Sequence, residues 1–187
     1  MDEQIRIRKA NSSDKSRILS LYKEVATHSG GILRKAHEIT GEYVDKFMNN
    51  SLADGIILVA EDTDTRQIVA ELHTRRPGVA VFSHVLGHLT IVVHPSFQRK
   101  GIGKGLFTAL FEEIKQNYPH ILRVELVAKE GNSGAVEFYK KLGFVEEGRM
   151  EKRILRDDGT FEADIPMAWF NPDYKSSGDT AKISNVC

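Results

Sequence analysis

The hydrophobic and polar positions of the N-terminal part change from a strand pattern to two helical patterns. Residues 5–8 alternate apolar and polar side chains, as in a half-buried strand. Ser12 or Ser13 is a candidate N-cap for a helix that would end at Ser29-Gly30-Gly31. Its apolar positions are Ile18, Leu19, Leu21, Tyr22 and Val25. A second helix is predicted over about residues 40–51. Its buried side consists of Tyr43, Val44, Phe47 and Met48.

The middle of the chain has strand-like runs followed by one long helical pattern. Residues 56–73 predict a β-hairpin, because two apolar runs flank the turn-like sequence Asp62-Thr63-Asp64-Thr65. A further strand over about 84–94 stops at Pro95. A glycine-rich segment follows, and a helix then continues to about 117. Its apolar positions are 102, 106, 107, 110, 111 and 114.

The C-terminal part predicts a strand, a short helix and an antiparallel pair. The strand covers residues 121–128, and the helix, about 133–142, ends at Gly143. Segments from Phe144 onward and over about 161–170 pair through the turn Asp157-Asp158-Gly159. The order β-α-α-β-β-β-α-β-α-β-β predicts a mixed sheet with helices on its faces, an α+β fold. We expect one domain over 1–172 and a polar, disordered tail over 173–187.

Composition narrows the class of protein. The chain has 187 residues, is 41% hydrophobic and 28% charged, and has a formal net charge of zero. These values fit a soluble globular domain and give no global reason to expect a nucleic-acid or membrane partner. The single cysteine, Cys187, excludes an intrachain disulfide, and the N-terminus lacks a secretory signal pattern. Because no stretch approaches the roughly 20 apolar residues of a spanning helix, we expect a cytoplasmic protein.

The glycine-rich turn between the strand at 84–94 and the next helix predicts an anion site. Gly101 and Gly103 carry no Cβ, so a ligand can approach their backbone closely. The turn lies at a helix N-terminus, where unpaired N–H groups and the positive end of the helix dipole point outward. Arg99, Lys100 and Lys104 add positive charge. A pyrophosphate is the expected ligand.

Two common phosphate-binding loops do not match this turn. A nucleotide-triphosphate loop requires G-x-x-x-x-G-K-[ST], but Gln98 stands at its first glycine and Gly105 at its Ser or Thr. A dinucleotide-binding loop requires G-x-G-x-x-G, but Leu106 stands at the last glycine. Both classes of protein are therefore excluded.

Two segments resemble the GNAT superfamily of acyl-CoA N-acyltransferases over about residues 5–170. Leu89–Pro95 followed by Gln98-Arg99-Lys100-Gly101-Ile102-Gly103 resembles its [QR]-x-x-G-x-[GA] signature, and Asn132 with 138–144 resembles a later motif. The resemblance implies a mostly antiparallel sheet of six to seven strands with about four helices. It also implies acetyl-CoA as acyl donor. The implied donor-binding residues are Ile91, Val92, Val93, Gln98, Arg99, Lys100, Gly101, Ile102, Gly103, Lys104, Asn132, Ala135 and Tyr139.

The short helix at about 133–142 carries the second part of the resemblance. Asn132 precedes the helix as an N-cap, and Tyr139 lies two turns further on the same face, with the small Ala135 between them. The resemblance implies that Asn132 contacts the donor and that Tyr139 protonates the departing thiolate. The alternatives are that Asn132 only caps the helix and that Tyr139 only packs against the sheet.

The base that takes a proton from the acceptor amine is less well defined by the sequence. Regular alternation would place His84, His88 and His94 on one face of their strand, and His88 is our first candidate. Glu71 on the neighbouring strand is the second candidate, and Glu125 is a third. A metal site built from these histidines is disfavoured, because no cysteine or carboxylate has fitting spacing.

The acceptor cannot be identified from the motifs above. The resemblance places acceptor specificity in about 12–51 and 144–170, and it favours a primary amine of a small molecule or amino acid that attacks the donor directly in a ternary complex. The alternatives are a protein or peptide N-acetyltransferase and a non-catalytic acyl-CoA sensor. Many members of the superfamily are dimers, so a homodimer is one alternative, although no interface signal is readable.

Overall fold

The structure is a computed structural model that describes residues 4–28 and 32–176. The chain forms two compact units. One contains the chain up to residue 75 together with 90–112, and the other contains 76–89 and the chain from 113 onward. Strand β4 (Val85–Val93) and helix α3 (Ile102–Asn117) each contribute residues to both units. The expectation of one domain over 1–172 stays a prediction.

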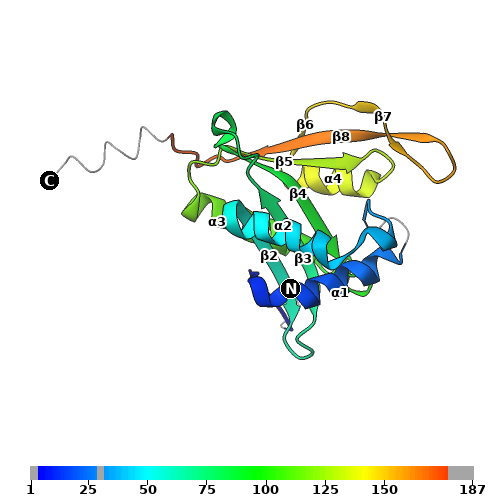
Figure 1. Cartoon of the computed structure of the whole chain (residues 1–187). Coiled ribbons are helices and arrows are strands. Elements are labelled where there is room, and N and C mark those ends of the chain that lie inside the picture. Colours follow the sequence, from blue (N-terminus) through cyan, green and yellow to red (C-terminus); the bar gives the residue numbers. More distant parts are fainter. Residues whose placement is uncertain (1–3, 29–31, 177–187) are drawn as a thin grey trace. The chain divides into compact units, whose positions relative to one another are not determined.

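Figure 1 shows the chain with its helices and strands labelled. Its helices are α1 (Lys15–Ala26), α2 (Gly41–Asp54), α3 (Ile102–Asn117) and α4 (Ser133–Lys141). Its strands are β1 (Ile5–Lys9), β2 (Gly55–Asp62), β3 (Ile68–Arg75), β4 (Val85–Val93), β5 (Arg123–Lys129), β6 (Val145–Glu146), β7 (Met150–Leu155) and β8 (Phe161–Phe170).

The strands follow the hydrogen-bonded order β1-β2-β3-β4-β5-β8-β6, and β7 also pairs with β8. The β4–β5 pair is parallel, whereas the pairs β1–β2, β2–β3, β5–β8, β6–β8 and β7–β8 are antiparallel. The predicted α+β class is therefore confirmed. The described part of the chain has eight strands, because the first arm of the C-terminal pair forms two short strands.

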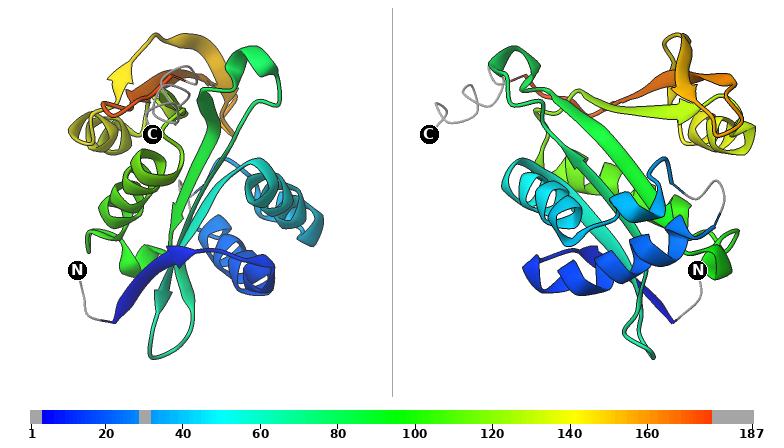
Figure 2. Two further views of the ribbon diagram at one scale, coloured as in Figure 1. Left: turned by 90° about the vertical axis from the view of Figure 1, so that its left-hand side faces the viewer. Right: turned by 45° about the vertical axis from the view of Figure 1, so that its right-hand side comes forward.

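In the first unit, helices cover both faces of strands β1 to β3. Figure 2 shows α1 and α2 on one face and α3 on the other. The apolar side chains of α1 and α2 pack against those of the strands in one core, as the helical spacing predicted. Its fully buried members include Ile18, Tyr22, Val44, Val59 and Val92.

The start of α1 differs from the prediction. Asn11 caps the short 3₁₀ turn Ser12–Asp14 that precedes α1: its Oδ1 accepts a hydrogen bond from the Ser13 N–H at 2.9 Å, and Asp14 completes a capping box. Ser12 and Ser13 instead lie within a short 3₁₀ turn. Helix α1 itself begins at Lys15 with Asp14 at its N-cap position, so the candidate caps Ser13 and Ser12 lie one and two residues too early. Helix α1 ends at Ala26, and the predicted stop at 29–31 lies outside the described residues.

A buried ionic cluster joins β1, β2 and α1. Glu61 and Asp14 are both fully buried. Arg8 donates to Glu61 at 2.8 Å and to Asp14 at 2.7 Å, and Arg17 pairs with both carboxylates. Arg6 and Arg66 also contact Glu61. This network fixes the first strand and the first helix to each other through charged hydrogen bonds.

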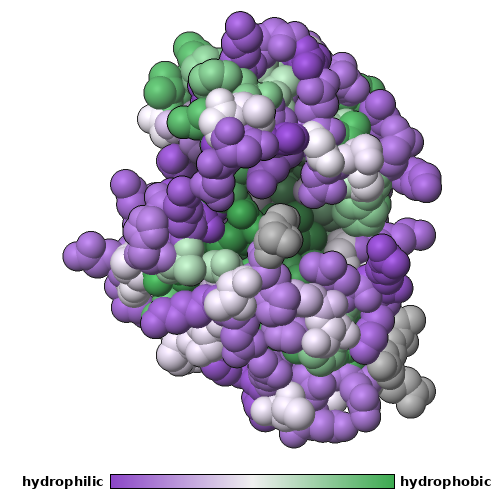
Figure 3. Space-filling view, turned by 90° about the vertical axis from the view of Figure 1, so that its right-hand side faces the viewer, coloured by the Kyte–Doolittle hydropathy of each residue, from purple (hydrophilic) through white to green (hydrophobic). Residues whose placement is uncertain are grey.

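In the second unit, β8 lies between β5 and the two short strands β6 and β7. Val124, Leu126 and Ala128 are buried on one face of β5, as the alternation predicted. Helix α4 contacts β5 and β6, and Gly143 ends it with a positive φ of 92°. The turn between β7 and β8 uses Gly159, with φ 80°. The surface seen in Figure 3 is mostly hydrophilic.

Candidate active site

The glycine-rich turn forms a concave backbone segment in front of α3. Arg99 has φ 60° and Gly101 has φ 81°, whereas α3 begins at Ile102 in right-handed conformation. When successive residues alternate between left-handed and right-handed backbone conformations, their N–H groups point toward one place. This geometry is called an anion-binding nest. The first N–H groups of α3 lie at the same place. The left-handed conformations of Arg99 and Gly101 are compatible with the predicted anion site, which stays a prediction.

Side chains of the first unit support this turn and give it charge. The Gln98 side-chain amide donates to the Val93 carbonyl at 3.2 Å, so it ties the turn to the end of β4. The Lys100 amine lies 4.9 Å from the centre of the Phe97 ring, a cation–π contact. Arg99, Lys100 and Lys104 are all exposed and can meet an anionic ligand.

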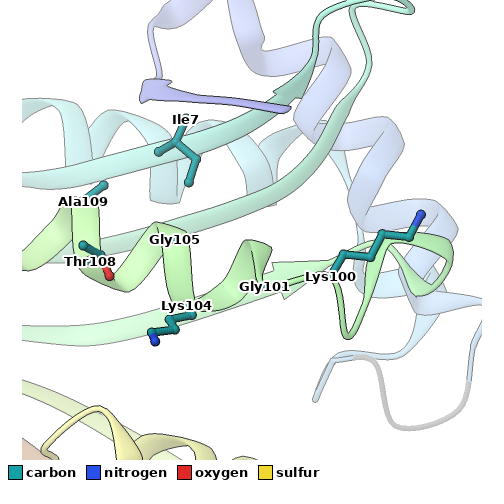
Figure 4. Close-up of a pocket in the computed structure, with 7 residues that line it drawn as sticks. All are labelled: Ile7, Lys100, Gly101, Lys104, Gly105, Thr108 and Ala109. Carbon is teal, nitrogen blue, oxygen red and sulfur yellow. The ribbon is translucent and has the colours of Figure 1, made fainter. Parts of the chain in front are cut away.

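A hollow of about 530 Å³ lies beside this turn, between β1 and α3. In Figure 4, Ile7 points from β1 toward α3. The hollow is lined by Ile7, Lys100, Gly101, Lys104, Gly105, Thr108 and Ala109. Two predicted anion-binding lysines, Lys100 and Lys104, therefore border a depression large enough for part of a ligand.

Strand β4 is irregular at His88. This residue has φ 54°, a left-handed conformation that interrupts the pleat. Regular alternation therefore stops at His88, and the prediction that His84, His88 and His94 share one face is wrong. The residues of β4 that pair with β5 are Val85 and Leu86, which precede the irregularity at His88. Ile91, Val92 and Val93, the predicted partners of the donor, follow it.

The histidines of this region have different surroundings. His88 is exposed. His94 caps the short 3₁₀ turn at 95–97 by accepting from the Ser96 N–H, and its Nε2 lies 3.1 Å from Glu24 on α1. Among the residues that the structure describes, no group of three or more His, Cys, Asp or Glu side chains could hold a metal ion.

Glu71 lies in a buried polar cluster of the first unit. Its side chain is fully buried, accepts a hydrogen bond from the Tyr22 hydroxyl at 2.7 Å and lies 3.1 Å from His73 Nδ1. The His73 ring stacks on Phe47 with centroids 4.2 Å apart. Burial, and then the Glu71 charge, raise the pKa of Tyr22 well above its ordinary value. These contacts give Glu71 a structural role, and its role as a base stays a prediction.

Helix α4 carries the remaining predicted residues. The Asn132 side chain accepts a hydrogen bond from the Ala135 N–H at 3.1 Å, so Asn132 is the N-cap. Tyr139 is partly buried, between Phe138 and Phe144. Burial raises the pKa of Tyr139 to about 12. The phenol is therefore protonated at neutral pH, which a general acid requires.

Glu125, the third candidate base, lies on β5 in the second unit. It is half-buried, and Arg123 Nε lies 2.8 Å from its carboxylate. Arg123 also makes two hydrogen bonds to Glu147, at 3.1 and 2.6 Å. Glu125 thus belongs to an ionic group that includes β5 and the segment after β6.

Several contacts of the site were not anticipated from the sequence. Strand alternation over β3 could have shown that Glu71 and His73 share a face, but it could not identify Tyr22 as their partner. The left-handed conformation of Arg99 could not be predicted from the sequence, because the residue types indicated such a conformation for the glycines alone. The brace from Gln98 to Val93 likewise depends on a local fold that no pattern encodes.

Comparisons with known proteins agree on one family. The family described as acetyltransferase (GNAT) domain matches residues 53–146. An uncharacterized N-acetyltransferase of Methanocaldococcus jannaschii is 43% identical over 70 residues, which are 34% of this chain and 30% of that protein. The L-amino acid N-acyltransferase MnaT of Escherichia coli is 24% identical over 144 residues, which are 77% of this chain and 81% of that protein.

Solved structures share the fold. The acetyltransferase of GNAT family from Streptococcus pneumoniae has a TM-score of 0.79 at 22% identity, over 89% of this chain and 99% of that chain. The yncA protein from Salmonella typhimurium, solved with its cofactor acetyl-CoA, has a TM-score of 0.76 at 17% identity, over 93% of this chain and 98% of that chain. At such identities the likeness concerns the fold.

The family match and the related N-acetyltransferases define the protein as an acyl-CoA-dependent acetyltransferase. The chain belongs to the GNAT acetyltransferase family, and the α+β fold and the glycine-rich turn that the sequence predicted agree with this membership. Within the described ranges, no helix has the length and apolar character needed to cross a membrane.

Proposed function

We propose that the protein transfers the acetyl group of acetyl-CoA to a primary amine of a small molecule or amino acid. The observation that carries this proposal is the backbone of Arg99 and Gly101, whose left-handed conformations form a nest directly before α3. Membership of the GNAT family supports acetyl transfer. The Escherichia coli relative, an L-amino acid N-acyltransferase, supports an amino-acid acceptor.

The donor phosphates bind at the turn before α3. The N–H groups of Arg99 to Lys104 receive the pyrophosphate, and Gln98 holds the turn against β4. The negative charge of the pyrophosphate is compensated by three exposed basic side chains, Arg99, Lys100 and Lys104. The main chain of Ile91, Val92 and Val93 pairs with the amide groups of the pantetheine arm, as an added strand would.

The reaction is a direct attack in a ternary complex. The amine nitrogen forms a bond to the thioester carbonyl carbon, the carbon–sulfur bond breaks, and the amine loses a proton to a base. His88 and Glu71 are the candidate bases. Tyr139 gives its phenolic proton to the departing thiolate; its phenol is protonated at neutral pH, and burial raises its pKa further, to about 12. Asn132 contacts the donor from the start of α4.

A thiol-release assay tests the proposal. Acetyl-CoA is incubated with free amino acids, polyamines, aminoglycosides and peptides in turn, and the free thiol is measured together with the mass of the acetylated product. We expect release with an amino acid or small amine, in a one-to-one ratio to product. Turnover with peptides alone would favour a peptide N-acetyltransferase. Tight binding of CoA without turnover on any amine would favour a non-catalytic sensor and contradict the proposal.

A further inference from the structure

The loop between β5 and α4 is held by the neighbouring strand β8. The Glu130 N–H donates to the Ala163 carbonyl at 3.0 Å, and the next N–H, that of Gly131, donates to the Glu162 carboxylate. The loop then closes on itself, because the Asn132 N–H donates to the Lys129 carbonyl at 3.0 Å. Two successive N–H groups before Asn132 are thus fixed by β8.

Gly131 is fitted to this contact. A Cβ at this position would lie 2.5 Å from Glu162 Oε1 and 2.9 Å from the Arg156 guanidinium, so the ends of both side chains would have to shift to admit it. The carboxylate therefore occupies the space of a side chain at position 131. The glycine leaves this space to the Glu162 carboxylate, and its φ is not positive.

The carboxylate of Glu162 is itself held in place. It is 9% exposed, and Arg156 Nε donates to its other oxygen at 3.0 Å. Hydrogen bonding from Arg156 lowers the pKa of Glu162, so the group is ionised at neutral pH. A second ion pair joins Arg149, just before β7, to Glu130 through two hydrogen bonds of 2.6 and 2.7 Å. The loop is therefore held both by β8 and by Arg149, which precedes β7.

We propose that Glu162 is a positioning residue for the acyl donor: its carboxylate fixes the Gly131 N–H and thereby the place from which Asn132 and α4 begin. Asn132 uses its side-chain oxygen to cap α4, so the orientation of its amide depends on where the loop ends. This inference rests on the proposed function, in which Asn132 contacts the donor. According to this inference, β8 contributes to donor binding indirectly, by holding the loop between β5 and α4.

Three variants separate this role from general stability. Glu162→Ala removes the acceptor of the Gly131 N–H, and Glu162→Gln keeps one oxygen acceptor of the same length. Asp158→Ala is the matched control, because Asp158 stabilises the β7–β8 turn by accepting two hydrogen bonds from Thr160, at 2.9 and 2.6 Å. Each variant is studied in the full chain, with thermal melting to confirm that it folds.

Amide hydrogen exchange followed by mass spectrometry reads the loop directly and needs no ligand. We expect Glu162→Ala to accelerate exchange over residues 129–136 by about tenfold, the effect of losing one hydrogen bond to a charged group. Glu162→Gln should restore much of the protection. Asp158→Ala should accelerate exchange around 155–161 and leave 129–136 as in the unmodified protein. Unchanged exchange at 129–136 in Glu162→Ala would overturn the proposal.

Steady-state kinetics then test the link to the donor. We expect Glu162→Ala to raise KM for acetyl-CoA by about tenfold with kcat within about twofold, and Glu162→Gln to reverse most of that rise. An equal rise in Asp158→Ala, or no difference between the Ala and Gln variants at Glu162, would contradict positioning. Failure of the unmodified protein to bind acetyl-CoA at all would contradict both proposals, whereas a changed exchange rate with unchanged KM would contradict this inference alone.

Discussion

Replacement of Glu61 by glutamine tests how much the buried ionic cluster stabilises the fold. Glu61 is fully buried and contacts Arg8 at 2.8 Å and Arg17 at 3.1 Å. Glutamine preserves the shape but removes the charge, so the surrounding guanidinium groups lose an ionic partner. Breaking a buried ion pair by removing one member is strongly destabilising, because the remaining charge stays desolvated.

The pKa of Glu61 sets the magnitude. Hydrogen bonds from Arg8 lower the pKa of Glu61 from 4.5 to about 2. Together with the hydrogen bonds from Arg6 and Arg17, they outweigh the effect of burial, which raises this pKa. At about 1.4 kcal/mol per pKa unit this corresponds to about 3 kcal/mol in favour of the ionised folded form. The Arg6 and Arg66 side chains are 53% and 63% exposed, so solvent screens part of this interaction. We therefore expect a net contribution of about 1–2 kcal/mol.

The sign of the pH dependence follows from the lowered pKa. The stabilisation is fully present above about pH 4.5 and is lost as the pH falls toward about 2, because the unfolded chain binds the proton first. Urea unfolding followed by circular dichroism from pH 7 to pH 3 measures it. The difference in unfolding free energy between the unmodified protein and Glu61→Gln should shrink as the pH falls.

A matched control identifies the source of that difference. Glu137→Gln also converts a carboxylate to an amide, but Glu137 is 62% exposed and pairs with Lys140 at 3.6 Å, so its change should be within about 0.5 kcal/mol. Parallel stability curves for the unmodified protein and Glu61→Gln over the whole pH range would refute the reasoning. They would show that Glu61 has the same pKa in the folded and unfolded states.

Three further changes test the site. Tyr139→Phe should lower kcat by about 100-fold or more without changing the Kd of acetyl-CoA measured by calorimetry, and unchanged turnover would reject the acid role. Gly101→Ala should weaken acetyl-CoA binding several-fold, because an alanine is strained at φ 81° although its Cβ would have open space. The control is Gly41→Ala, where the Cβ also has open space but φ is not positive. Equal binding of acetyl-CoA by both variants would argue against the nest. Glu71→Gln should lower the free energy of unfolding by about 1–3 kcal/mol, measured by urea denaturation, because Tyr22 loses a charged hydrogen-bond partner; an unchanged midpoint would contradict the structural role.

Elements whose pattern is local could be predicted from the sequence. The spacing of apolar residues over 102–114 predicted α3, and the alternation over 121–128 predicted the buried face of β5. The glycine-rich turn was predicted as an anion site because its residue types and its place before a helix both favour one. These features depend on a few consecutive residues; the structure confirms α3 and the buried face of β5, and the anion site stays a prediction.

Features that depend on distant residues could not be predicted in this way. Glu162 is the second residue of β8, and nothing nearby in the sequence indicates that its carboxylate occupies the space of a side chain at Gly131. The partnership of Tyr22 with Glu71 joins α1 to β3 across 49 positions. In both cases the fold brings together residues whose individual patterns are ordinary, so a periodicity analysis gives no signal.

Backbone strain offers an independent indication of where the chemistry lies. Among the described residues, the non-glycine positions with positive φ are Arg66, His88, Arg99 and Lys152. Such conformations cost energy and persist where the surrounding structure requires them, often at functional sites. Two of these residues, His88 and Arg99, are also candidate site residues by the sequence pattern. His88 is exposed, whereas Glu71 is buried and accepts a hydrogen bond from the Tyr22 hydroxyl, so His88 stays our first candidate base. A base at His88 would be lost in His88→Gln, which steady-state kinetics would show as a fall in kcat, whereas Glu71→Gln should lower the free energy of unfolding.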